Sequence, residues 1–88
     1  MLTPERIREI FEATTSGLAS YQGQDRTLLG LNLIHRHTGM GVGAAEHDII
    51  YSAASLDDLA ASPITEDEVA ELARMNWHID DDGLAKFV

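Results

Sequence analysis

Residues 44–53 read AAEHDIIYSA, and their centre is the densest run of β-branched and aromatic residues in the chain. Such a run favours a β-strand, which we expect over residues 47–53. Alternate side chains of a strand point to opposite faces of the sheet. One face would carry His47, Ile49, Tyr51 and Ala53, and the other Asp48, Ile50 and Ser52. We expect the first of these faces to lie against the core.

The last twelve residues, WHIDDDGLAKFV, have the pattern of a β-hairpin. A three-residue loop over residues 81–83 would place Gly83 in the left-handed conformation that glycine tolerates best. The two strands would then cover about residues 77–80 and 84–88. Because a lone hairpin is barely stable in water, we expect it to join the 47–53 strand in an antiparallel sheet.

Two helices are expected in the first half of the chain. Thr3 can cap the first, which has apolar residues at helical spacing as far as Leu18 and would end a few residues later. Asp25 can cap the second, over residues 25–37. This second helix is apolar around a wide arc, which predicts burial on more than one side or a homodimer contact between two copies of the chain. Gly30 in its middle would let a neighbouring backbone approach closely.

The second half has its own helix signals. Thr65 and Glu68 form a capping box, which predicts a helix over residues 65–76. Ser55 is expected to cap a shorter helix before it. Residues 39–43 read GMGVG and are predicted to be a flexible linker. Their spacing does not indicate a phosphate-binding loop, because that loop follows a strand and precedes a helix, and the order here is reversed.

These elements predict a single small α+β domain over residues 1–88. It would consist of N-terminal helices, a small antiparallel sheet (about 47–53, 77–80 and 84–88) and the 65–76 helix packed on that sheet. A chain of this length can form one modest core. It has no cysteine, which favours a cytoplasmic setting. No apolar run is long enough to span a bilayer, and the N-terminal sequence does not resemble a signal peptide.

The charge is divided unevenly along the chain. Residues 1–45 hold four acidic and four basic residues, whereas residues 46–88 hold eleven acidic and two basic residues, which gives 2 − 11 = −9. Such a field repels nucleic acid and anionic membranes and attracts basic surfaces. The same charge also favours solubility, which is the alternative and more common explanation of such a surplus. As a functional expectation, the field predicts a protein partner with a basic surface and no direct binding to nucleic acid or membrane.

The acids of the second half are the candidate partner-binding residues. They fall in the 65–76 helix and in the hairpin loop, together with one aromatic residue: Glu66, Asp67, Glu68, Glu71, Asp80, Asp81, Asp82 and Trp77. Core packing with one hydrogen bond is the alternative for Trp77, and an exposed position beside the acids would favour an interface.

A metal or small-ligand site is the alternative function. His35, His37 and His47 are the candidate metal ligands, since an extended H-x-H segment would point both imidazoles the same way. In a helix, however, positions i and i+2 diverge, and histidines near a helix C-terminus interact favourably with its dipole. Glu46-His47-Asp48 offers a base and an orienting acid, but adjacent residues of a strand face opposite ways. No nucleophile motif is present, so we assign no catalytic residue and no cofactor.

The second half of the chain resembles a group of proteins. The motif A-x-H-D-x-I-Y over residues 45–51, a capped acidic helix and a terminal tryptophan hairpin are similar to those of small uncharacterised accessory proteins of bacterial and phage genomes. The resemblance implies no activity and no site residue. It favours a phage or mobile-element accessory protein. Together with the acidic second half, this predicts a non-enzymatic interaction protein, in its most concrete form a phage-type inhibitor of a nucleic-acid-binding protein. A structural homo-oligomer subunit, joined through the 25–37 helix, is a further alternative.

Overall fold

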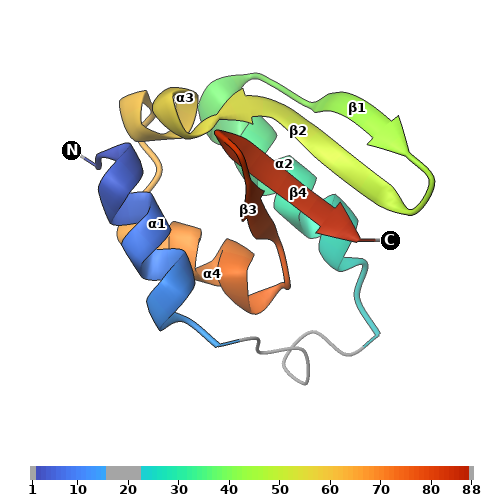
Figure 1. Cartoon of the computed structure of the whole chain (residues 1–88), viewed down its shortest axis with the longest axis horizontal. Helices are drawn as coiled ribbons and strands as arrows, with labels where there is room; N and C mark the ends of the chain where they lie inside the picture. The colour runs from blue at the N-terminus through green and yellow to red at the C-terminus, as the bar shows by residue number, and fades with distance from the viewer. Residues whose placement is uncertain (1, 16–22, 88) are drawn as a thin grey trace.

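A four-stranded antiparallel sheet with strand order β1-β2-β4-β3 forms one layer of the molecule, with α2 behind β2 and β4 (Figure 1). The computed structural model describes residues 2–15 and 23–87, and within them the chain forms four helices and four strands. They follow one another as α1 Pro4–Ala13, α2 Arg26–Thr38, β1 Val42–Glu46, β2 Ile49–Ser55, α3 Leu56–Ala61, α4 Glu66–Arg74, β3 His78–Asp80 and β4 Gly83–Phe87. The predicted α+β fold, with helices packed on an antiparallel sheet, is confirmed.

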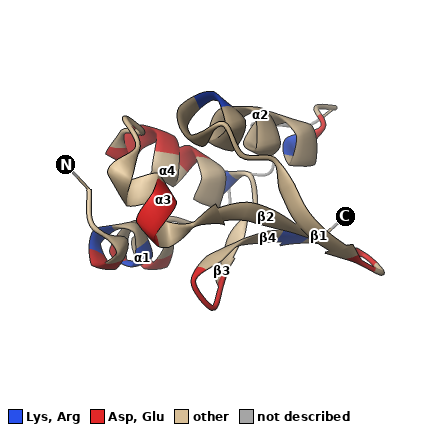
Figure 2. Ribbon diagram, turned by 90° about the horizontal axis from the view of Figure 1, so that it is seen from above, with Lys and Arg blue, Asp and Glu red and all other residues tan. Residues whose placement is uncertain are grey.

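The helices cover one face of the sheet and one end of it (Figure 2). α2 lies across β2 and β4, α3 continues directly from β2, and α1 packs against both α3 and α4. The chain therefore builds a single core between the helices and the inner face of the sheet. Its largest fully buried side chains are Ile7, Ile34, Leu56, Leu59, Val69, Leu72 and Leu84.

The predicted helix starts are confirmed. Thr65 and Glu68 form a capping box at the start of α4, and Ser55 forms a second one with Asp58 at the start of α3. The side chains of Thr3 and Asp25 accept hydrogen bonds from the first turns of α1 and α2. Each cap satisfies backbone N–H groups that have no partner within the helix.

The first helix is shorter than predicted. α1 ends at Ala13, and Thr14 has the extended dihedral angles φ −102° and ψ 123°. Thr14 and Thr15 are β-branched and have weak helix propensity, which accounts for the early end. The remainder of the predicted helix, with Leu18, lies outside the described residues.

The predicted linker over residues 39–43 is wrong in its second half. Val42–Glu46 forms β1, which pairs with β2 at the edge of the sheet. His47 and Asp48, predicted as strand residues, form the turn between these strands, and His47 has a positive φ of 51°. Glycine and alanine have low strand propensity, so pairing with β2 rather than composition makes this segment a strand.

The inner and outer faces of β2 are the reverse of the prediction. Leu84 on β4 is 1% exposed and belongs to the core. Lys86 lies two residues further on, so it shares the inner face with its cross-strand partner Ile50. Ile49 and Tyr51 consequently point away from the helices. Two adjacent isoleucines leave the facing of a strand ambiguous in sequence, which explains the error.

The C-terminal hairpin is confirmed, but its register differs from the prediction by one residue. Asp80 pairs with Gly83, so the loop is the two residues Asp81 and Asp82. Asp81 has the positive φ, at 54°, that the prediction assigned to Gly83. A positive φ at the first loop residue is typical of the turns that match the twist of a hairpin.

The C-terminus of α4 directs Trp77 into the core. Asn76 is left-handed with φ 71°, its N–H donates to the carbonyl oxygen of Ala73, and the N–H of Trp77 donates to that of Leu72, both at 3.1 Å. This is the hydrogen-bond pattern of a Schellman motif. Leu72 and Trp77, the two positions whose contact accompanies the motif, are both buried. α4 accordingly ends at Arg74 rather than at residue 76.

The indole ring of Trp77 lies against α2 at Gly30. Its Nε1 donates a hydrogen bond to the carbonyl oxygen of Arg26 at 3.2 Å. A Cβ atom on Gly30 would overlap with Nε1 and Cε2 of the indole ring. Gly30 thus allows the close approach that its position predicted, but of a side chain rather than a backbone.

Replacement of Gly30 by alanine should destabilise the protein, although alanine favours a helix over glycine by about 1 kcal/mol. The added methyl group displaces the indole ring, and overpacking of this kind costs about 1–3 kcal/mol, so we expect a net loss. Chemical denaturation followed by circular dichroism measures this loss.

Asn32→Ala provides the matched control, because Asn32 is an exposed position of the same helix and its replacement should be neutral or slightly stabilising. In a Trp77→Leu background, Gly30→Ala should lose most of its cost. An equal cost in both backgrounds would contradict the packing described here.

Candidate protein-interaction surface

The acids singled out for partner binding form two separate groups in the structure. Glu66, Asp67, Glu68 and Glu71 lie on α4, whereas Asp80 ends β3 and the next two aspartates form the turn to β4. Figure 2 shows this turn projecting from the side of the sheet opposite α2. The two groups therefore do not make one continuous acidic patch.

Arginines from the first half of the chain neutralise part of the α4 group. Arg6 Nη2 is 2.8 Å from Glu66 Oε1, and its Nε donates to Oε2 at 3.1 Å. This hydrogen-bonded ion pair lowers the pKa of Glu66. Arg36 Nη2 donates to Glu68 Oε2 at 2.8 Å. Glu71 also has a polar contact within the chain, so it is not a free carboxylate. The charge separation along the sequence is thus partly cancelled in space.

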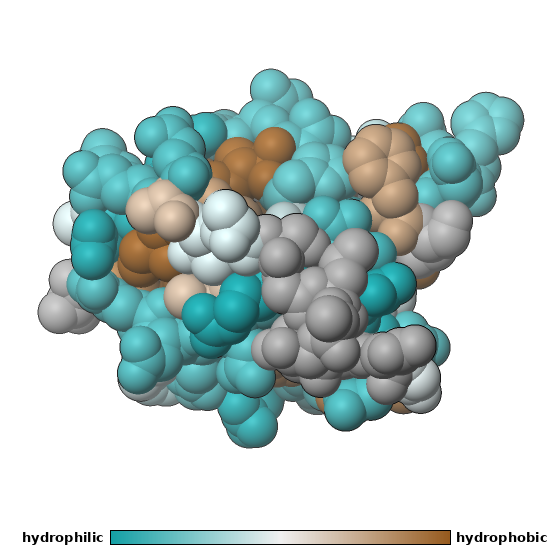
Figure 3. All heavy atoms as spheres, turned by 90° about the horizontal axis from the view of Figure 1, so that it is seen from below, coloured by the Kyte–Doolittle hydropathy of each residue, from teal (hydrophilic) through white to brown (hydrophobic). Residues whose placement is uncertain are grey.

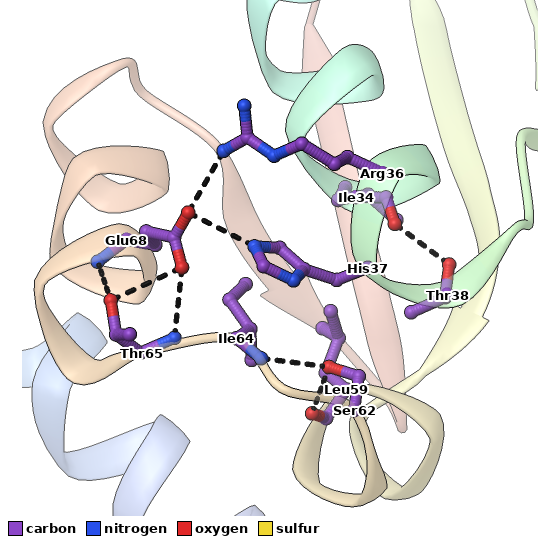
Figure 4. A network of polar contacts seen from close by, with 9 residues as sticks. All are labelled: Ile34, Arg36, His37, Thr38, Leu59, Ser62, Ile64, Thr65 and Glu68. Atoms are coloured by element: carbon purple, nitrogen blue, oxygen red, sulfur yellow. Dashed lines mark hydrogen bonds and ion pairs between the residues drawn. The ribbon is translucent and has the colours of Figure 1, made fainter.

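Glu68 is the centre of a polar network between α2 and α4 (Figure 4). Its Oε1 accepts hydrogen bonds from the N–H and the hydroxyl of Thr65, at 3.0 and 3.1 Å. Its Oε2 accepts from Arg36 and from Nε2 of His37, the latter at 2.9 Å. Burial opposes the charge of this carboxylate, but the hydrogen bonds outweigh it and lower the pKa of Glu68 to about 2. These contacts make Glu68 a link between helices.

The β3–β4 turn is more accessible than the α4 group. The side chain of Asp82 is 94% exposed, and Arg8 approaches it at 3.6 Å while donating to the carbonyl oxygen of Asp81 at 2.8 Å. An ion pair at this exposure contributes little energy, so the aspartate stays available. The β1–β2 hairpin carries two further acids, Glu46 at the end of β1 and Asp48 in the turn. Both lie outside the predicted partner-binding set, and the polar run Glu46-His47-Asp48 was the signal in the sequence for this exposed end of the hairpin.

Trp77 belongs to the core. Its side chain is 3% exposed and makes the single hydrogen bond described above, so it is not part of the exposed surface. Lys86 is also withdrawn from the surface, at 5% exposure. Burial lowers the pKa of Lys86, whose Nζ donates to the carbonyl oxygen of Phe87 at 2.7 Å. The strands therefore display carboxylates, whereas their one lysine faces inward.

The three candidate metal ligands do not converge. His35 and His37 lie two residues apart on α2, where side chains diverge, and His37 contacts Glu68. His47 lies in the β1–β2 turn. In residues 2–15 and 23–87, no group of three histidine, aspartate or glutamate side chains is placed to hold a metal ion.

A hollow of about 370 Å³ lies between α1 and the start of β3. Phe11 and Ile79 contribute apolar surface to it, and Glu12 and His78 contribute polar groups. Seen from below, the protein shows small separate hydrophobic patches among hydrophilic residues (Figure 3). A small ligand in this hollow would contact the N-terminal helix and the hairpin together.

Comparisons with known proteins give no further guide to the site. No family model, no curated protein and no solved structure matches the chain. Among the described helices, none combines the length and the apolar character needed to cross a membrane. The chemistry of the surface itself therefore carries the functional argument.

Replacement of Glu68 by glutamine should reduce stability at neutral pH by about 2 kcal/mol, the usual contribution of hydrogen bonds to a charged group. Glutamine can retain the capping box, so the substitution isolates the charge that Arg36 and His37 contact. The pKa of Glu68 is about 2 in the folded chain against an ordinary 4.5. Its stabilisation is therefore complete above about pH 4.5 and is lost as the pH falls towards 2.

Denaturation of the wild type and the variant across this pH range tests the prediction, because the difference between them should shrink as the solution is acidified. Asp67→Asn, one residue earlier in the same turn, is the control with the same change of charge and should have a small effect. A wild-type advantage over Glu68→Gln that is constant from pH 7 to pH 2 would contradict the assignment.

Proposed function

We propose that this protein is a non-enzymatic interaction module that docks on the basic surface of a nucleic-acid-binding partner. In its most concrete form it is an inhibitor of phage or mobile-element type. The observation that carries the proposal is where the charges lie: most cations are engaged within the molecule, while acids occupy both hairpin turns.

The cations of the chain are largely engaged by its own groups. Arg6, Arg8 and Arg36 contact carboxylates from the second half, and Lys86 is buried. The acids outnumber the basic residues by nine, 6 − 15 = −9, so the surplus remains on the surface. A field of this sign steers basic partners towards the protein and fixes their orientation more than it adds affinity.

The partner's chemistry follows from the same field. A surface that binds phosphates is rich in lysine and arginine, which makes it complementary to exposed carboxylates. Nucleic acid itself would be repelled. An acidic module on such a surface would exclude the phosphates and thereby block nucleic-acid binding.

A displacement assay tests this proposal. A fluorescent duplex oligonucleotide is bound to a peptide rich in lysine and arginine, and the protein is titrated into the complex at low and at high salt. We expect release of the duplex at low salt and a steep loss of competition as salt screens the charges. Absence of release at low salt, or release that does not depend on salt, would overturn the proposal.

The variant Asp80→Asn, Asp81→Asn, Asp82→Asn should compete about tenfold less well, at roughly 0.5 kcal/mol for each exposed charge. Asparagine suits the left-handed conformation of residue 81, so the turn should be retained. The matched control neutralises three acids elsewhere, Glu5, Glu12 and Asp57. Equal losses in the two variants would mean that only net charge matters.

A homodimer through α2 is the second candidate, because this helix exposes two large apolar side chains. Leu28 is 53% exposed and Leu29 is 36% exposed. Two copies in contact there would remove both from water. Light scattering should then give twice the chain mass, and Leu28→Asp should give the monomer. A monomer at all concentrations of the wild type would exclude this contact.

A further inference from the structure

The outer face of the sheet carries exposed aromatic residues between two acidic edges. Cross-strand pairing places eight side chains on this face, which we call the open sheet face: Ala44, Glu46, Ile49, Tyr51, His78, Asp80, Ala85 and Phe87. Pairing joins Glu46 to Ile49 and Ile49 to Phe87, so these three lie in one row across the strands. In Figure 1, α2 lies behind β2 and β4, and no described helix lies in front of them.

The aromatic residues of this face lie on three neighbouring strands, and two of them are stacked. Phe87 is 52% exposed, and its ring stacks on that of His78 with centroids 5.0 Å apart and an interplanar angle of 20°. Ala85 lies between the two aromatic strands, opposite both Tyr51 and His78, and is fully buried. Tyr51 and His78 therefore flank this small residue, one on each neighbouring strand.

Acids border these rings on both sides. Glu46 lies on the edge strand β1 and Asp80 on the opposite edge strand β3, each on the open sheet face. The sheet has one lysine and no arginine in its strands, and this lysine, Lys86, points to the other face. The open sheet face therefore combines aromatic rings with carboxylates and has no lysine or arginine of its own.

Arginine is the side chain that this combination fits best. Its guanidinium group stacks on aromatic rings and at the same time donates paired hydrogen bonds to carboxylates. Lysine can form the ion pair, but it lacks the planar group that stacks. Nucleic-acid bases also stack on aromatic residues of a sheet, but Glu46, Asp80 and the net charge of −9 would repel their phosphates.

We propose that the open sheet face binds an arginine-rich segment of the protein partner, with guanidinium groups over Phe87 and Tyr51 and with Glu46 and Asp80 as their ion-pair partners. This inference rests on the proposed function, since it names the surface and the side chain through which the acidic module would recognise a basic protein. Phe87 is the central residue, because it is the most exposed ring and joins His78 to the strand pair.

The test measures fluorescence anisotropy of labelled peptides of equal length and charge. One alternates arginine with serine, a second alternates lysine with serine, and a labelled single-stranded oligonucleotide is the third probe. We expect the arginine peptide to bind more tightly than the lysine peptide, and the oligonucleotide not to bind. Phe87→Ala should weaken the arginine peptide about fivefold and leave the lysine peptide nearly unchanged.

Val42→Ala is the matched control, since Val42 on β1 is exposed to the same extent as Phe87, at 52%, but pairs with Ser52 and so points to the other face of the sheet. It should leave binding unchanged, and the thermal midpoint of each variant confirms that it is folded. Glu46→Gln and Asp80→Asn should each weaken both peptides and reduce the salt dependence of binding.

The outcomes separate the two proposals. Arginine binding that depends on salt but is unaffected by Phe87→Ala would overturn the open sheet face and leave the acidic docking function standing. If the oligonucleotide binds and Phe87→Ala abolishes that binding, the ligand of the open sheet face is a nucleic acid and not an arginine-rich segment. Failure of both peptides to bind at low salt would overturn both proposals.

Discussion

The packing of the Trp77 indole ring on Gly30 is the contact on which the rest of the structure depends. It joins the end of α4 to the middle of α2, and the hydrogen bond to the carbonyl oxygen of Arg26 fixes the direction of the ring. Because Trp77 is held in the core, β3 begins at His78 and pairs with β4 in the observed register. That register turns Leu84 inward and Phe87 outward. The exposed aromatic face is thus a consequence of a buried contact between two residues that are 77 − 30 = 47 positions apart in sequence.

Local signals in the sequence were sufficient to predict the helix starts, because an N-cap side chain and the backbone N–H that it binds are only three residues apart. The fold class followed from these caps and from the terminal hairpin. The sequence could not predict which face of β2 lies against the core, nor the strand register of the hairpin. Each depends on the position of Trp77 against α2. β1 was missed because its alanines and glycine carry no strand signal of their own. Asn76, left-handed at the end of α4, was a local signal that could have placed Trp77.

The distribution of charge is the property in which the structure differs most from what the sequence predicted. The sequence divides the charge into a neutral half and an acidic half, but Arg6 and Arg36 cross that division and hold Glu66 and Glu68 on α4. Part of the predicted partner-binding set consequently holds helices together. The acids of the two hairpins, by contrast, are exposed and lie apart from these helix contacts. The proposed recognition and the observed stability therefore depend on different carboxylates of the same chain.

Fluorescence of the indole ring tests the central contact directly, because Trp77 is the single tryptophan of the chain. A ring buried on Gly30 should emit at shorter wavelength in native buffer than in denaturant and should be protected from quenching by acrylamide. Its emission should move to longer wavelength in the same transition in which circular dichroism is lost. Native emission and quenching equal to those of the unfolded chain would show that Trp77 is exposed to water, and would contradict the arrangement of the hairpin, α2 and α4 described here.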